Sequence, residues 1–132
     1  MFGNILKNIH ETLGPGYSEA IYHNALEVEL RQMNIPYETE RIIPIFYHDH
    51  VIGNLRADII VDRSFIIELK AVRSLTDEHI EQVRRYLRLT GLSRGLAVNF
   101  GKKLEMREVN LESFSTPTVN GEEGFCLQLE RS

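Results

Sequence analysis

The sequence predicts an α/β fold in which helices flank a central mixed sheet, with the element order α-α-β-β-β-α-β. Apolar residues recur at helical spacing before residue 14, over residues 19–33 and again after residue 76. Two runs rich in isoleucine and valine flank a polar break near residue 63, which is typical of a β-hairpin. A short apolar run bounded by glycines follows the third helical segment, so we expect a parallel strand reached by a crossover.

The first two helices are separated by the chain break Gly14-Pro15-Gly16. The first helix is expected to pack on the sheet, and Ser18 is the expected N-cap of the second, over residues 19–33. The second helix carries two apolar rows at helical spacing, whose members are Ile21, Ala25 and Val28 in one and Leu26, Leu30 and Met33 in the other.

Residues 37–47 read as a strand, and Pro44 favours an edge position or a bulge because proline cannot donate a ladder hydrogen bond. The turn that follows contains His48 and His50. Since the chain offers no convincing third and fourth ligands for this pair, we do not expect a zinc site there.

The next hairpin has a register set by its three-residue turn. Its expected cross-strand pairs are Val61 with Phe65, Ile60 with Ile66, Ile59 with Ile67 and Asp58 with Glu68. Side chains on a strand repeat with period 2, which puts Lys70 on the same sheet face as Glu68. One face of a largely apolar hairpin is therefore expected to carry Asp58, Glu68 and Lys70.

Two carboxylates opposed on a sheet destabilise it, and partial burial raises their pKa unless a cation compensates. A divalent metal resolves this conflict, because Mg²⁺ is commonly held by one or two carboxylates together with water and phosphate. The lysine beside them could orient the attacking water or stabilise charge on a phosphate. The alternative is that Glu68 with Lys70, and Asp58 with Arg56, form ordinary surface ion pairs.

Asp58 followed by Glu68-Leu69-Lys70 resembles the core motif of the PD-(D/E)XK nuclease superfamily, with Ala57 in place of the motif's proline. The resemblance implies a restriction-endonuclease-like core and hydrolysis of phosphodiester bonds that depends on Mg²⁺ or Mn²⁺. It also implies roles for these residues. Asp58 and Glu68 would hold the metal with the backbone carbonyl of Leu69, and Lys70 would position the attacking water.

A second match lies upstream, where Gly16, Glu19 and Tyr22 have the spacing G-x-x-E-x-x-Y. This is similar to the motif of the GxxExxY group within the same superfamily. By resemblance, Glu19 is an additional acid that projects toward the metal site from the second helix. The alternative is that Glu19 only complements the helix dipole in the first turn.

The third helix is expected to begin at a Thr76 or Ser74 cap and to end at Gly91. Its buried row is Ile80, Val83 and Leu87. Gln82 and Tyr86 resemble the Gln-x-x-x-Tyr motif of the exonuclease-like branch, which implies that they border the active site. The alternative is helix-edge packing, and His79 lies on the same edge without an assigned role.

Residues 94–101 are expected to form the buried parallel strand, and its ending, Asn99-Phe100-Gly101, is similar to that of the GxxExxY group. The resemblance thus extends over residues 6–101. Residues 104–111 are a candidate for one more strand.

The net charge of −4 argues against a protein that coats nucleic acid through bulk electrostatics. A nuclease can instead use a local basic rim, for which the candidates are Arg84, Arg85 and Arg88 on the third helix and Lys102 and Lys103 after the last core strand. The alternative for the arginines is surface pairing with Glu81.

We expect residues 1–111 to form a single domain and residues 112–132 a partly irregular extension, with an alternating segment at 125–129 that could be an edge strand. A single cysteine, Cys126, excludes an internal disulfide and fits a cytoplasmic location. No segment is apolar and long enough to span a membrane.

The expected function is that of a metal-dependent nuclease, with DNA as the favoured substrate and a homodimer expected if both strands of a duplex are cut. Two alternatives stay open. One is a binding module for nucleic acid or protein that has kept the fold without catalysis, and the other is a hydrolase of small phosphate esters.

Overall fold

A five-stranded mixed sheet forms the centre of the protein in the computed structural model, which describes residues 2–111. The strands lie in the order β1-β2-β3-β4-β5, and only β3 and β4 are parallel. Along the chain the elements are α1 (Phe2–Leu13), α2 (Glu19–Gln32), β1 (Tyr37–Tyr47), β2 (His50–Val61), β3 (Phe65–Lys70), α3 (Asp77–Thr90), β4 (Arg94–Phe100) and β5 (Leu104–Asn110). The predicted fold class and element order are confirmed, and the candidate strand at 104–111 is present as β5.

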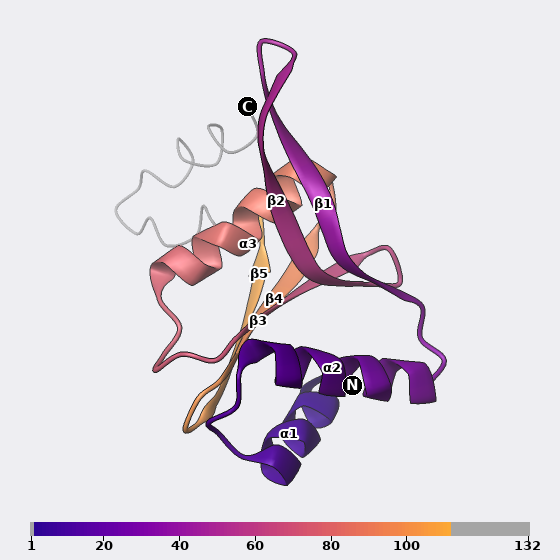
Figure 1. Ribbon diagram of the computed structural model, residues 1–132, viewed down its shortest axis with the longest axis vertical. Helices are drawn as coiled ribbons and strands as arrows, with labels where there is room; N and C mark the ends of the chain where they lie inside the picture. Colours follow the sequence, from indigo (N-terminus) through magenta and orange to yellow (C-terminus); the bar gives the residue numbers. More distant parts are fainter. Residues whose placement is uncertain (1, 112–132) are drawn as a thin grey trace, which may run out of the picture.

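The helices cover opposite faces of the sheet, with α1 and α2 on one face and α3 on the other (Figure 1). This follows from the alternation of side chains along β3, where Ile67 packs with α1 and α2 while Ile66 packs with α3. In β4, Val98 and Ala97 divide between the two clusters in the same way. Each face thus has its own apolar core, and polar residues of the central strands must lie where these cores end.

Helix boundaries follow the local signals in the sequence. Ser18 is the N-cap of α2, with extended backbone, and the hydroxyl of Thr76 caps α3 by accepting a hydrogen bond from the His79 N–H at 3.3 Å. Gly91 ends α3 with a φ of 80°, a conformation that suits glycine. Buried Ile80, Val83 and Leu87 confirm the predicted inner row of this helix.

Helix α2 buries a different set of residues than its apolar rows indicate. Tyr22, Leu26 and Leu30 face the sheet and are fully buried, whereas Ile21, Val28 and Met33 are each 42% exposed. Apolar spacing alone gives two rows on this helix, and the sheet packs against Leu26 and Leu30 of the second row together with Tyr22, which belongs to neither.

Strand β1 lies at the edge of the sheet, as Pro44 indicates, and its register with β2 shifts between Ile45 and Phe46. The β1–β2 hairpin extends well beyond the rest of the sheet (Figure 1). Within residues 2–111, no helix is long and apolar enough to cross a membrane. The predicted segment at 125–129 and Cys126 lie outside the described residues.

Candidate active site

The β2–β3 hairpin forms three of the predicted pairs, Val61 with Phe65, Ile60 with Ile66 and Ile59 with Ile67. The backbone ladder ends there, so the predicted pair of Asp58 with Glu68 is not formed. Beyond it, the side chain of Asp58 replaces the backbone, because its Oδ2 accepts a hydrogen bond from the Leu69 N–H at 2.9 Å. The two strands separate at this point, and the carboxylate of Asp58 is fixed in the opening.

Glu68 is the most buried carboxylate of the site, with 4% of its surface exposed. Its Oε1 atom has no hydrogen-bond partner within the described residues, and its Oε2 lies 4.0 Å from the Lys70 Nζ. Burial, and after it the charge of Asp58, raises the pKa of Glu68 to about 8. Without a further cation this carboxyl group is therefore poorly stabilised in its charged form.

Asp58 experiences a similar conflict. Burial raises its pKa, the hydrogen bond from Leu69 and the charges of His23 and Lys70 oppose that rise, and the charge of Glu19 adds to it. Asp58 and Glu68 thus lie in a partly buried region with little positive charge to compensate their own.

A cavity of about 210 Å³ opens beside Asp58, between β2, β3 and the first turns of α2. Its lining residues are Glu19, Ala20, His23, Asn24, Glu40, Asp58 and Leu69. The first residue of α2, Glu19, is thus brought to the same cavity as Asp58.

The loop before α2 explains how Glu19 is positioned. Gly16 has a φ of 109°, which permits the turn into the helix. The hydroxyl of Tyr22 donates a hydrogen bond to the Gly14 carbonyl at 2.6 Å and accepts one from the Tyr17 N–H at 3.3 Å. The glycine and tyrosine of the G-x-x-E-x-x-Y spacing therefore shape the loop, while its glutamate lines the cavity.

Four lining residues were not identified from the sequence, and two of them, His23 and Glu40, have titratable side chains. His23 lies one helical turn after Glu19 and forms an ion pair with Glu27 at 2.8 Å, so its spacing could have indicated it. Glu40 has a left-handed φ of 51° and lies between the residues that pair with Ile59 and Ala57. Its place beside Asp58 depends on the β1–β2 register, which no local signal reveals.

Helix α3 approaches the carboxylates from the other face of the sheet. The hydroxyl of Tyr86 donates a hydrogen bond to the Arg56 carbonyl at 2.6 Å and accepts one from the Gln82 Nε2 at 3.2 Å. Burial, and after it the charge of Glu68, raises the pKa of Tyr86 to about 12, so this hydroxyl stays protonated. Tyr86 thus ties α3 to β2 two residues before Asp58.

His79 has a structural part at the start of α3. Its Nδ1 accepts a hydrogen bond from the Thr76 N–H at 3.0 Å, which completes the cap of the helix.

Asn99 fixes the segment that follows Lys70. Its side chain is fully buried, accepts a hydrogen bond from the Val72 N–H at 2.8 Å and donates one to the Val72 carbonyl at 2.9 Å. The same amide donates to Glu105 at 2.8 Å, and Glu105 also accepts from the Leu75 N–H at 3.0 Å. The chain between β3 and α3 is thereby clamped to the end of β4.

The arginines of α3 are engaged by acidic side chains of their own helix. Glu81 contacts Arg84 at 3.1 Å and Arg88 at 2.7 Å, and Arg85 lies 3.5 Å from Glu78. For Arg84 and Arg88 this is the pairing with Glu81 that the sequence offered as an alternative, whereas Arg85 pairs with Glu78 instead. Lys102 and Lys103 are exposed in the turn between β4 and β5.

The donor set fits a hard divalent cation. The unpaired Oε1 of buried Glu68 and the carboxylate of Asp58 are oxygen donors, and Mg²⁺ binds through one or two carboxylates while water and phosphate complete its shell. Among residues 2–111 no group of three or more His, Cys, Asp or Glu side chains is arranged to hold a metal ion alone.

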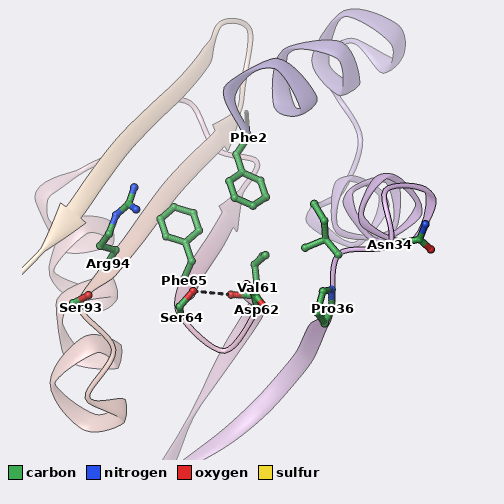
Figure 2. A pocket seen from close by; sticks show the side chains of 10 residues that line it. Phe2, Asn34, Pro36, Val61, Asp62, Ser64, Phe65, Ser93 and Arg94 are labelled. Carbon is green, nitrogen blue, oxygen red and sulfur yellow. Dashed lines mark hydrogen bonds between the residues drawn. The ribbon is translucent and has the colours of Figure 1, made fainter.

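A larger cavity of about 460 Å³ lies at the other end of α2, beside the β2–β3 turn (Figure 2). Phe2 stacks on Phe65 there with ring centroids 5.5 Å apart, and the Arg94 guanidinium lies 5.1 Å from the centre of the Phe65 ring. Arg94 also bonds to Glu108 at 2.8 Å. This cavity adjoins the start of β3, whereas the carboxylates lie toward its end.

Comparison with known proteins places these features in a family. A profile of the PD-(D/E)XK nuclease superfamily matches residues 2–110. No curated protein matches the chain. The protein in the crystal structure of SSO0001 is 30% identical in sequence to this chain, and the two structures match with a TM-score of 0.56. The match covers 69% of this chain and 48% of that one.

The structure of an alkaline exonuclease (LHK-Exo) from Laribacter hongkongensis is 13% identical with a TM-score of 0.43, over 86% of this chain and 66% of that one. The chain thus spans about half of the first structure's length and about two thirds of the second's.

Proposed function

The chain belongs to the PD-(D/E)XK nuclease superfamily, and from this membership we propose that it hydrolyses phosphodiester bonds of nucleic acid, with DNA as the favoured substrate and Mg²⁺ or Mn²⁺ as cofactor. The fold is restriction-endonuclease-like. The observation that supports the proposal most directly is Glu68, a buried carboxylate with an unpaired oxygen, beside Asp58 and 4.0 Å from Lys70.

Asp58 and Glu68 are the proposed ligands of the cation, with the backbone carbonyl of Leu69 as a third. The Leu69 N–H fixes the orientation of Asp58, so the donor atoms are organised before a substrate arrives. Glu19, at the far wall of the same cavity, is proposed to contact the cation's water shell. A bound divalent cation supplies Lewis acidity toward the phosphate and acidifies a water molecule.

Lys70 is proposed to hold the attacking water or a phosphate oxygen. Its Nζ lies 4.0 Å from the Glu68 carboxylate, and its side chain is only 19% exposed, so the charge is held beside the carboxylates. Tyr86 and Gln82 are proposed as positioning residues, because the Tyr86 hydroxyl holds the β2 backbone next to Asp58.

Membership in the GxxExxY group is proposed from Gly16, Glu19 and Tyr22. The structure gives each of the three a distinct part in building the cavity wall, since Gly16 turns the chain, Tyr22 ties the loop and Glu19 lines the cavity.

The test is cleavage of end-labelled single-stranded and duplex DNA and RNA with Mg²⁺ or Mn²⁺. Wild type would be compared with Glu68→Gln and Lys70→Ala, and with Glu108→Gln, which alters an exposed glutamate remote from the carboxylates, as the matched control. We expect wild type and the control to cleave, and a chelator or either site substitution to reduce the rate at least 100-fold. Equal cleavage by wild type and Glu68→Gln would contradict the proposal.

Cutting both strands of a duplex with one small active site requires two copies of the chain, so we further propose a homodimer on duplex DNA. Light scattering with and without a duplex oligonucleotide tests this, and a strictly monomeric complex that still makes double-strand breaks would contradict it.

A further inference from the structure

The loop between β3 and α3, which begins directly after Lys70, contacts the end of β4 at the turn into β5. Their backbones touch at Gly101. A Cβ atom added there would lie 2.8 Å from the Val72 carbonyl oxygen and 3.5 Å from that of Arg73, so only glycine permits this approach. The side chain of Asn99 bonds both backbone groups of Val72 and locks the same contact.

Three exposed cationic residues belong to the two segments that meet at this contact. Arg73 belongs to the loop, while Lys102 and Lys103 directly follow Gly101 in the turn. We propose that these three exposed residues form a phosphate-binding ridge that holds the nucleic-acid strand beside the scissile bond. The inference rests on the proposed nuclease function and names the surface by which the substrate is bound.

The charges of the ridge are available to an external anion. Within the part of the chain that the structure describes, none of the ion pairs involves Arg73, Lys102 or Lys103. The candidate arginines on α3 differ, since Arg85 contacts Glu78 and Arg84 contacts Glu81. In a protein whose net charge is −4, a local group of cations free of such ion pairs favours the binding of a polyanion.

The ridge is also within reach of the reacting phosphate. Arg73 follows Lys70 by three residues, a span of at most about 11 Å of extended chain. A nucleic-acid strand advances about 3.4 Å along its axis per nucleotide. The ridge would therefore contact phosphates within about three nucleotides of the bond to be cut, on the backbone and without regard to base sequence.

Binding without cleavage tests the ridge. Fluorescence anisotropy in a chelator would measure the affinity of the full chain for labelled single-stranded DNA, duplex DNA and single-stranded RNA over a range of salt concentrations. The variant combines Arg73→Ala, Lys102→Ala and Lys103→Ala. Its matched control combines Arg31→Ala, Arg63→Ala and Arg94→Ala, three exposed cations elsewhere that give the same change in net charge.

We expect the ridge variant to bind at least tenfold more weakly than the control at low salt. Its plot of log affinity against log salt should be shallower by about 2 to 3, because each lost phosphate contact removes about 0.7 to 0.9 from the slope. Each single substitution should remove about a third of that change. Equal affinity and equal slope for the ridge variant and the control would overturn the ridge.

The two proposals fail separately. Cleavage that Glu68→Gln abolishes, combined with unchanged binding by the ridge variant, would keep the nuclease and reject the ridge. Binding that the ridge variant loses, with no cleavage by wild type, would keep the ridge and reject the nuclease. The polymer whose binding falls most identifies the strand that the ridge holds.

Discussion

The ring of Tyr22 stacks on the ring of Phe100, with centroids 4.4 Å apart and ring planes within 1° of parallel. One residue belongs to α2 and the other to β4, so the contact joins the helix that carries Glu19 to the strand that carries Asn99. Because the Tyr22 hydroxyl also bonds the Gly14 carbonyl, this single side chain fixes the start of α2 against the sheet and the preceding loop.

Tyr22→Phe should keep the stack and lose the bond to Gly14. We expect the free energy of unfolding to fall by about 1 kcal/mol, since the partly buried Gly14 carbonyl loses its donor. Urea unfolding measures this, and Tyr47→Phe, at the exposed hairpin tip, is the control. The cleavage rate should fall by more than the loss of folded protein explains, because the loop that positions Glu19 is no longer held by the Tyr22 hydroxyl. Unchanged stability would show that the hydrogen bond from Tyr22 to Gly14 does not stabilise the protein.

Glu68→Gln should stabilise the protein without metal, in a pH-dependent way. Glutamate ionises near pH 4.5 when exposed, whereas the pKa of folded Glu68 is about 8. Wild type therefore loses stability as the pH rises through this interval. The unfolded chain ionises Glu68 freely there, whereas the folded protein must either bury the charge of Glu68 or keep its proton. At about 1.4 kcal/mol per pKa unit, the variant should gain a few kcal/mol at pH 8 and almost nothing near pH 4. Thermal melts across pH measure it, and a gain that is constant with pH would contradict the cause.

Mg²⁺ should stabilise wild type and leave Glu68→Gln unaffected. A ligand that binds only the folded state at 100 times its Kd adds about 2.7 kcal/mol. Differential scanning fluorimetry with Mg²⁺, and with K⁺ at matched ionic strength, separates specific binding from salt effects. Asp58→Asn should also lose the response. A Mg²⁺ shift of equal size in all three proteins would place the ion elsewhere.

Tyr86→Phe should reduce activity through the position of Asp58. The substitution removes the 2.6 Å, partly buried bond to the Arg56 carbonyl, which costs about 1 kcal/mol of stability. We expect kcat to fall about tenfold with KM nearly unchanged, since the tyrosine acts on the site and not on the strand. Steady-state cleavage measures this, with Tyr37→Phe, which alters a surface hydroxyl, as the comparison. A change confined to KM would instead make Tyr86 a substrate contact.

Gly101→Ala should destabilise the protein by about 1 to 3 kcal/mol, because the new methyl group would overlap the Val72 carbonyl oxygen. Gly53→Ala is a matched control, since a Cβ atom there meets no other atom within 4 Å. Chemical denaturation compares the two. Equal stability of both variants would show that the loop after Lys70 shifts to accommodate the methyl group at little cost in free energy. That result would weaken the case for a rigid ridge.

Short-range signals predicted the parts of the fold that depend on neighbours in sequence. The β2–β3 register followed from a three-residue turn and the two-residue period of a strand, and this placed Asp58 near Glu68. Thr76 and Gly91 marked the ends of α3 because capping is a property of the helix end itself.

Long-range packing decided the rest. Which face of α2 packs on the sheet depends on the fit of Tyr22 against Phe100, and the spacing of apolar residues does not determine it. Glu40 enters the cavity only because the β1–β2 pairing puts it beside Asp58. The buried clamp of Asn99 joins residues 27 positions apart, which is beyond the reach of any local pattern.

The left-handed backbone of Glu40 has a consequence for how this protein would respond to selection. A non-glycine residue in that conformation costs about 1 to 2 kcal/mol, and it lines the same cavity as Asp58, whose charged form is disfavoured by burial. The cheapest gains in thermal tolerance therefore lie at the cavity itself. A screen for heat resistance alone would therefore select substitutions at these positions first. The selected variants would survive heating but would lack the groups on which the proposed reaction depends.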